Sequence, residues 1–146
     1  MVVLPYADKV HDAILVTAAA SWYLVGLSVT VGLVTYPAFS LVGDGQWPSY
    51  HRHHSARISW AVGVAWVAQA VGLLWWFGAA KHPSTQWFLC GTATAAAVVI
   101  TGLFAVGLHN RLGRERAPSA LRSLNRVHTV RTVLWIVAAL AVTAAL

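Results

Sequence analysis

The sequence predicts an all-α integral membrane protein, a bundle of four membrane-spanning helices. Hydrophobic residues make up 58% of the chain and charged residues 10%, whereas an ordinary soluble domain has about 25% charged residues. Residues 13–43, 58–80 and 83–108 contain no Asp, Glu, Lys, Arg or His. A helix needs about 20 apolar residues to cross a bilayer core, so each of these stretches can supply one span. Residues 132–146 offer a fourth.

A short signature occurs twice, 74 residues apart. The sequences HSAR at residues 54–57 and HTVR at residues 128–131 each follow a basic region and precede an apolar run that contains a Trp. In a helix, residues i and i+3 lie on one face, so we expect each His to lie beside its Arg. We therefore interpret residues 1–146 as a single domain made of two tandem helical hairpins, residues 13–80 and 85–146.

Local signals bound the first hairpin. The first helix covers about residues 13–36, after a short polar leader, and we expect it to end at Pro37. The reason is that the residue before a proline is pushed out of helical backbone angles. A connector over residues 38–48 contains the tripeptide GDG, which is typical of a turn. The second helix covers about residues 49–78.

The second hairpin follows a tight turn at residues 81–84. Ser84 or Thr85 can supply the N-cap of the third helix, which continues to about Leu108. A basic loop covers residues 111–116, and the fourth helix restarts at Pro118 and Ser119.

The fourth span places two ionisable residues at the membrane. Only 15 residues follow Arg131, which is about 22 Å of helix, so the membrane-crossing part must begin near residues 125–128. We then expect His128 at a membrane boundary and Arg131 one turn deeper. A charge at that depth is costly unless it reaches the headgroups or finds a partner inside the bundle. The duplicated signature favours a shared site inside the bundle.

The distribution of basic residues predicts the topology. Of the ten Lys and Arg, eight lie in or beside the first and third connections, and only Lys9 and Lys81 lie at the other end. Basic loops stay in the cytoplasm, so we expect a multi-pass protein of the cell (inner) membrane with both termini outside. The net charge of +6 is explained by this topology and by anionic lipid, and we expect no nucleic-acid partner.

Histidine supplies the candidate chemistry, because the single Cys90 excludes a cysteine metal site. His51 and His54 share a helix face, whereas His53 is rotated by about 100° from His54. Imidazole suits haem iron and Fe, Cu or Zn ions. Two other interpretations stay open: a basic cluster that binds lipid headgroups, and general acid–base chemistry without a metal. The candidate metal ligands are His51, His54, His109 and His128.

Two arginines complete the predicted site. A pair of guanidinium groups at one end of a bundle can hold a haem propionate, a phosphate, an ionised phenol or a carboxylate. Tyr50 and Asn125 fall on the same helix faces as the signature histidines, where they can orient the imidazoles. The predicted catalytic residues are His54, His128, Arg57 and Arg131.

Trp60 and Trp135 follow the two signatures and can flank a flat aromatic ligand or cofactor. Core packing is the alternative role for both. Gln69 is the strong polar group in the middle of the second helix, and we expect it to bond to a neighbouring helix. The predicted cofactor-binding residues are His51, His109, Tyr50, Asn125, Trp60 and Trp135.

These motifs resemble a known family. The sequences LHNRL at residues 108–112 and LNRVHTVRT at residues 124–132 are similar to motifs of small bacterial and fungal four-helix membrane proteins, a family that includes the anthrone oxygenases of polyketide pathways. The sequence YPAF at residues 36–39, with Tyr50, His51 and His54, resembles a related group of bacterial membrane proteins. The resemblance implies a four-helix membrane bundle and oxidation of a lipophilic aromatic substrate, and Asn110, His128 and Arg131 carry it.

The sequence therefore predicts a small membrane oxidoreductase or oxygenase that acts on a lipophilic aromatic or quinone-like molecule. The alternative is a non-catalytic subunit or a transporter-like protein whose His/Arg cluster binds lipid headgroups or an anionic ligand. The expected partners are a lipophilic small molecule and membrane lipids, and a homo-oligomer is compatible with the sequence.

Overall fold

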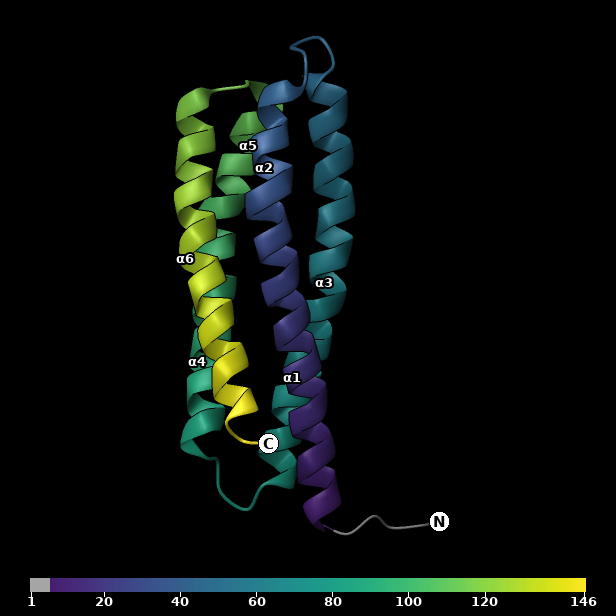
Figure 1. Ribbon diagram of the computed structural model, residues 1–146, viewed down its shortest axis with the longest axis vertical. Coiled ribbons are helices and arrows are strands. Elements are labelled where there is room, and N and C mark those ends of the chain that lie inside the picture. The colour runs from purple at the N-terminus through teal and green to yellow at the C-terminus, as the bar shows by residue number, and fades with distance from the viewer. Residues whose placement is uncertain (1–5) are drawn as a thin grey trace.

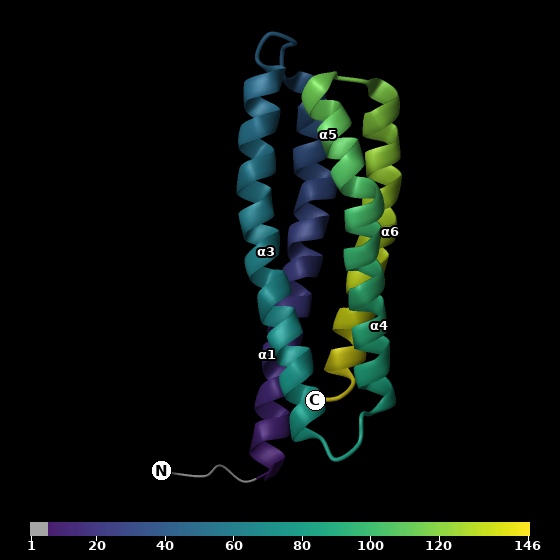
Figure 2. The same ribbon diagram turned by 180° about the vertical axis from the view of Figure 1, so that it is seen from behind.

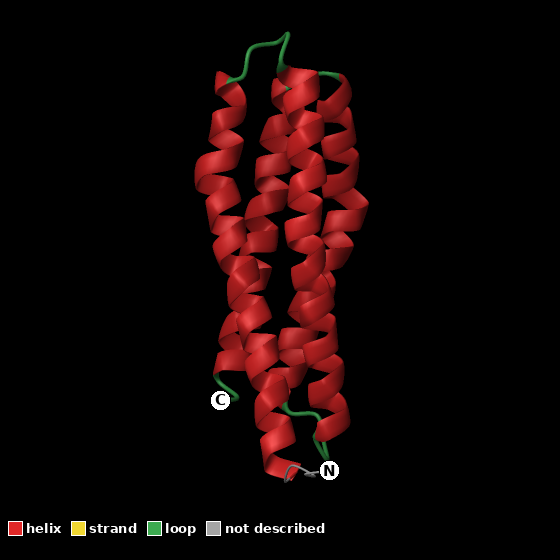
Figure 3. Ribbon diagram, turned by 90° about the vertical axis from the view of Figure 1, so that its right-hand side faces the viewer, coloured by secondary structure: helices red, strands yellow, loops and turns green. Residues whose placement is uncertain are grey.

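The computed structural model describes residues 6–146 as a bundle of four long helices (Figure 1). α1 begins and α6 ends at one end of the bundle, and the connections after the first and third spans lie at the other (Figures 1 and 3). We call the latter the basic end, because Arg52, Arg111, Arg114 and Arg116 lie in or beside those connections. The predicted all-α membrane architecture is confirmed, since four helices are long and apolar enough to cross a membrane: Asp8–Leu41, Trp47–Ala79, Thr85–Arg114 and Pro118–Thr143.

The first span is one helical rod that contains a wide turn. The prediction that it ends at Pro37 is wrong. Pro37 has no N–H, and its ring would collide with the carbonyl four residues earlier in a regular α-helix. A π-helical turn immediately before Pro37 widens the rod at this point, so the chain continues as helix. The segments are α1 (Tyr6–Thr30), the π turn η1 (Val31–Thr35), α2 (Tyr36–Ala38) and the 3-10 turn η2 (Phe39–Leu41).

The third span also contains a π turn. It extends beyond the predicted end at Leu108 through much of the predicted basic loop, because two arginines in its last turn complement the negative end of the helix dipole. Ser84 is the N-cap, as predicted: its hydroxyl accepts a hydrogen bond from the Trp87 N–H at 3.2 Å. The segments are α4 (Thr85–Ile100), the π turn η3 (Thr101–Ala105) and α5 (Val106–Arg114).

The second and fourth spans are uninterrupted helices, α3 (Trp47–Ala79) and α6 (Pro118–Thr143). Each has a proline in its first turn, where the missing N–H has no intrahelical partner to lose. α6 therefore begins at the predicted Pro118, and the residues before His128 form its first turns.

The helices form a ring that is loosely packed on one side, between α3 and the helices α4 and α5. α1 packs along both α3 and α6, and α4 packs along α6, whereas α3 makes few contacts with α4 and α5. Figure 2 views the bundle from the side on which α3 and α5 face each other. α1 and α3 lie close together at Gly72, where an added Cβ would lie 2.5 Å from Thr17 Oγ1. A residue without a side chain therefore permits this packing.

Three clusters of buried side chains fill the bundle from end to end. Leu73 and Trp76 belong to the cluster near the chain ends, Trp135 to the central cluster, and Phe39 and Trp47 to the cluster at the basic end. The central and basic-end clusters flank the cavity that is described next.

Gln69 bonds to neighbouring helices, as predicted, and joins three helices in the half of the bundle nearer the chain ends. Its Oε1 accepts a hydrogen bond from Ser21 Oγ at 3.0 Å, and its Nε2 donates to Thr94 Oγ1 at 3.1 Å. The amide is buried and satisfied, so Gln69 stabilises the packing of α1, α3 and α4.

Candidate functional site

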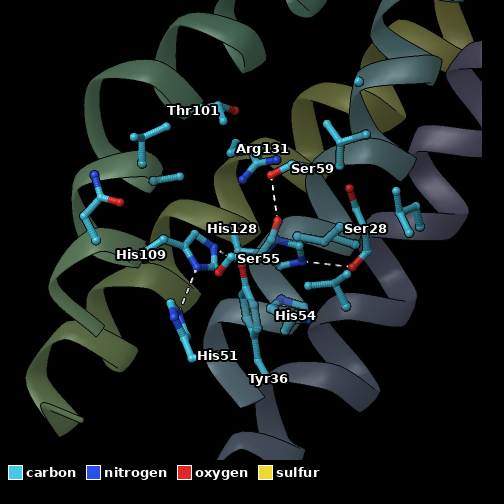
Figure 4. Close-up of a pocket in the computed structure, with 18 of the residues that line it drawn as sticks. Ser28, Tyr36, His51, His54, Ser55, Ser59, Thr101, His109, His128 and Arg131 are labelled. Carbon is cyan, nitrogen blue, oxygen red and sulfur yellow. Dashed lines mark hydrogen bonds between the residues drawn. The ribbon is translucent and has the colours of Figure 1, made fainter. Parts of the chain in front are cut away.

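A cavity of about 590 Å³ lies inside the bundle toward the basic end. This volume falls within the usual range of small-molecule sites. Figure 4 shows polar side chains from all four spans gathered around it. The apolar and aromatic part of the cavity wall includes Leu24, Ile58, Trp66 and Trp135. The polar lining residues include Ser28, Tyr36, His51, His54, Ser55, His109, Asn110, His128 and Arg131.

Tyr36, His109 and His51 form a chain of hydrogen bonds at the basic end of the cavity (Figure 4). The Tyr36 hydroxyl lies 3.4 Å from His109 Nε2, and His109 Nδ1 lies 3.4 Å from His51 Nε2. One assignment of tautomers satisfies both contacts: the Tyr36 hydroxyl donates to His109 Nε2, and His109 Nδ1–H donates to His51 Nε2. The chain joins α2, α5 and α3, so it fixes the relative positions of three elements.

His128 is held by the first span. Its Nε2 lies 2.9 Å from the backbone carbonyl of Ser28, to which it donates a hydrogen bond. In the neutral imidazole this leaves Nδ1 as the acceptor. Gly32 makes room for the ring, since an added Cβ there would lie 3.2 Å from His128 Nε2. Tyr36 packs edge-on against the same ring at 5.0 Å between centroids.

Four buried polar atoms have no hydrogen-bond partner within residues 6–146, and all four belong to residues that line the cavity. Buried polar atoms in proteins nearly always have a partner. Their shared location therefore indicates a surface suited to a polar group of a ligand. The atoms are His54 Nε2, Ser55 Oγ, Trp66 Nε1 and Arg131 Nε.

Arg131 is the most unusual of these residues. Its side chain is 9% exposed, and it lies about 20 Å along α6 from the first residue of that helix. It has no carboxylate partner in the part of the chain that the structure describes. Burying a charge without a partner costs several kcal/mol. Arg131 is therefore the residue to which an anionic group would bind most favourably.

The structure does not bring Arg57 and Arg131 together. Arg57 is exposed on α3 outside the cavity, and Trp60 is 76% exposed, whereas Trp135 is 1% exposed and lines the cavity. The reason is a difference in helix phase. Along α6 the lining residue that follows His128 is Arg131, three positions on. Along α3 the lining residues that follow His54 are Ser55 and Ile58, and Arg57 lies between these two on the exposed face.

The inward faces of α3 and α6 match at an offset of 77 residues, instead of the predicted 74. This register pairs His51 with His128 and His54 with Arg131. It also pairs Trp47 with Leu124, Ile58 with Trp135, and Ala65 with Val142. The predicted equivalence of Arg57 with Arg131 and of Trp60 with Trp135 is corrected accordingly. The tandem hairpin repeat itself stays a prediction.

Two predicted orienting residues lie outside the cavity. Tyr50 and Asn125 are both exposed and do not line it. Tyr50 instead packs edge-on against Phe39 at 5.9 Å. His53 is exposed, as its rotation away from His54 predicts. His109 is instead positioned by its contacts with Tyr36 and His51, and His128 by the Ser28 carbonyl.

The four predicted metal ligands do not form a ligand set. His51, His54, His109 and His128 all line the cavity, but no group of three or more His, Cys, Asp or Glu in the described residues is arranged to hold a metal ion. His51 and His109 are joined by their hydrogen bond, and His128 Nε2 is engaged by a carbonyl. The arrangement of these side chains therefore does not support the predicted metal site, and the predicted haem stays a prediction.

Sequence reasoning missed Tyr36, Ser28, Ser55 and Trp66 as site residues. Tyr36 carries a signal that could have identified it, because a hydroxyl directly before a proline in an apolar helix lies where the backbone is irregular. Ser28, Ser55 and Trp66 carry none, since Ser and Trp are common in membrane spans.

Comparison with protein-family models, with curated proteins and with solved structures finds no match to this chain. The geometry of the cavity is therefore what bears on the function of this protein.

Proposed function

We propose that this protein binds a lipophilic molecule with one acidic group, and that the acidic group lies beside Arg131. The observation that carries the proposal is the buried guanidinium, which has an unpartnered Nε and no carboxylate partner within residues 6–146. A phenolate, enolate or carboxylate supplies the missing charge and accepts hydrogen bonds from the guanidinium. The rest of the ligand contacts apolar wall, so the ligand is amphiphilic.

The walls favour a ring-bearing ligand. Trp66 and Trp135 line the cavity on different helices, and Trp66 Nε1 is a further buried donor without a partner. Aromatic faces pack favourably on a flat conjugated head, and an indole N–H can bond to an oxygen on it. The proposed ligand class therefore includes the aromatic or quinone-like molecules expected from the sequence.

His54 is the proposed proton acceptor. Its Nε2 is buried, lines the cavity and has no partner in the described residues, whereas His51, His109 and His128 are hydrogen-bonded. A neutral His54 would take the proton from a phenol or enol head, and the resulting anion would bind to Arg131. Loss of that proton makes the ring electron-rich, which is the direction required by an oxidation of the ligand.

Binding without chemistry is the second candidate function. The observation that favours it is the chain from Tyr36 through His109 to His51, which occupies three polar residues in contacts within the protein. A carrier or a non-catalytic subunit needs only the Arg131 anchor and the apolar walls. Turnover of a bound ligand in air, with consumption of dioxygen, distinguishes an oxygenase from a carrier.

The proposed location is the cell (inner) membrane, with the basic end in the cytoplasm and both termini outside. The support is the asymmetry of charge: with Arg57 and Arg131 left aside, six Arg lie in or near the two connections of the basic end, and only Lys9 and Lys81 lie toward the other end.

An equilibrium binding measurement tests the proposal. The probe is a nitrophenol that bears a dodecyl tail, added to the purified protein in lipid nanodiscs and followed by quenching of Trp fluorescence. Arg131→Met should weaken binding about 30-fold or more, because the loss of a buried charged partner costs about 2 kcal/mol or more. Arg57→Met is the matched control, since Arg57 is exposed outside the cavity, and it should bind like the unmodified protein. Equal affinities for both variants would contradict the proposal.

A further inference from the structure

The cavity opens between two particular helices. All of its exposed lining residues belong to α3 or α5, whereas the lining residues from α1, η1, α2 and α6 are buried or half-buried. The opening therefore lies on the loosely packed side of the ring, where α3 makes few contacts with α5 (Figure 2). The exposed lining residues are Pro48, Arg52 and Ser59 on α3 and Val106, Asn110 and Gly113 on α5.

This opening runs along the side of the bundle. Between Pro48 and Ser59, α3 advances by about 16 Å, so the opening reaches well beyond the basic end. The outer surface beside its deeper part is apolar: Trp60 on α3 and Leu103 and Phe104 on η3 are highly exposed. Exposed apolar surface on a membrane span faces hydrocarbon. The deeper part of the opening therefore faces the bilayer interior, and its shallow part, at Arg52, lies toward the headgroups.

We propose that this opening is a lateral entrance from the bilayer, and that the ligand is an acid with a single apolar tail. The inference rests on the proposed function, from which it takes the acidic head beside Arg131. The cavity has room for a ring-sized head. A tail that leaves between Ser59 and Val106 stays in lipid, which is as apolar as the protein wall. A tailed acid can thus place its head at Arg131 without withdrawing its chain from the membrane.

The kinetics of probe binding test the entrance. The dodecyl nitrophenol is mixed with nanodiscs, and Trp quenching is followed by stopped flow. Ser59→Trp places a large ring in the opening from the α3 side, and Val106→Trp does so from the α5 side. Each should slow both association and dissociation about tenfold or more, because a narrowed entrance raises the barrier in both directions.

Val64→Trp is the matched control, because Val64 is 64% exposed on α3 and does not line the cavity. It should bind the probe at the rates of the unmodified protein. If Ser59→Trp and Val106→Trp also bind at those rates, the lateral entrance is overturned while the binding site stands. If the unmodified protein binds no probe, the proposed function fails and the inference fails with it.

A photoreactive tail tests the orientation of the ligand independently of any variant. A diazirine at the methyl end of the same dodecyl nitrophenol should label lipid and the outer surface beside the opening, at Trp60 or Leu103. Labelling of Trp135 or Ser28, which are buried in the interior, would show the tail inside the cavity and would overturn the proposal.

Discussion

At the scale of single residues, the binding properties of the cavity depend on the free energies of the contacts that its polar groups make. A hydrogen bond such as that between His128 Nε2 and the Ser28 carbonyl contributes about 1 kcal/mol. A buried unpaired guanidinium costs several kcal/mol. Arg131 therefore dominates the energetics of the cavity, and the histidines determine its shape and its proton chemistry.

Replacing Gly32 by Ala should displace His128. An added Cβ lies 3.2 Å from His128 Nε2, so the ring must shift and its bond to Ser28 must weaken. We expect Gly32→Ala to lower the free energy of unfolding by about 1 kcal/mol, measured by titration with SDS and circular dichroism. Gly26→Ala is the control on the same helix, where an added Cβ meets nothing within 4 Å, and it should not destabilise the protein. Equal stability of the two variants would show that His128 is not held in this way.

Replacing His54 by Ala should reduce ionisation of the bound probe, whereas replacing its neighbour should not. His54 Nε2 is buried in the cavity without a partner, and His53 is exposed on the outer face of α3. The measurement is the visible absorbance of the yellow nitrophenolate in the two variants. A loss of colour in His53→Ala as large as in His54→Ala would refute the assignment of His54 as proton acceptor.

The sequence predicted part of this site and missed the rest for a definable reason. Histidine and arginine in apolar helices are costly, so their presence alone pointed to His51, His54, His109, His128 and Arg131, and all five line the cavity. Whether the arginine of each signature faces inward depends on whether an inward-facing position lies three or four residues after the histidine. The signature could not decide this, because both spacings occur on one helix face.

At the scale of elements, the two π turns and one arginine shape the basic end. η1 contributes Val31 to the cavity wall and η3 contributes Thr101 and Ala105. Proline explains η1 but not η3, which has no proline, and nothing in the structure explains why η3 forms. Hydropathy predicted neither turn, because it shows only that residues 13–43 and 83–108 are apolar. This is why the sequence predicted the spans correctly and the end of the first helix wrongly.

Arg116 joins the two connections of the basic end. Its Nη1 donates to the carbonyl of Val42 at 2.6 Å and to Asp44 Oδ1 at 2.8 Å. Its Nη2 donates to the carbonyls of Phe39 and Ser40, each at 2.9 Å. Phe39 in turn packs edge-on against the cavity-lining His54 at 5.1 Å, so Arg116 supports His54 through Phe39.

Replacing Arg116 by Lys should cost about 2 kcal/mol of unfolding free energy, because Lys keeps the charge but loses the planar fork that serves several carbonyls. The ion pair itself should contribute little, since the Asp44 side chain is 92% exposed. Asp44→Asn should therefore change stability by less than about 0.5 kcal/mol. SDS titration measures both, and an Asp44→Asn loss as large as that of Arg116→Lys would show that the ion pair matters more than the carbonyls.

At the scale of the whole molecule, an even number of spans places both chain ends on one side and both basic connections on the other (Figure 1). The architecture could be predicted because length and hydropathy suffice to identify four spans. The cavity could not, because it arises from the weak packing of α3 against α4 and α5, and no local pattern records which neighbouring helices pack loosely.

Cysteine labelling tests the orientation of the bundle. In a Cys90→Ala background, a Cys at Ser84 should react in intact cells with a thiol reagent that does not cross membranes, because that connection is predicted outside. A Cys at Ser119, which is exposed at the basic end, should react only after the membrane is opened. Reaction of the Ser119 position in intact cells would reverse the predicted orientation.

The absorption spectrum of the bound nitrophenol tests the central claim most directly, that the cavity holds an anion beside Arg131. The measurement is made at a pH at which the probe in empty nanodiscs is colourless phenol. We predict that the unmodified protein turns the bound probe into the yellow phenolate, and that Arg131→Met at saturating probe leaves it colourless. A colourless probe bound to the unmodified protein, or an equally yellow probe on Arg131→Met, would contradict the account.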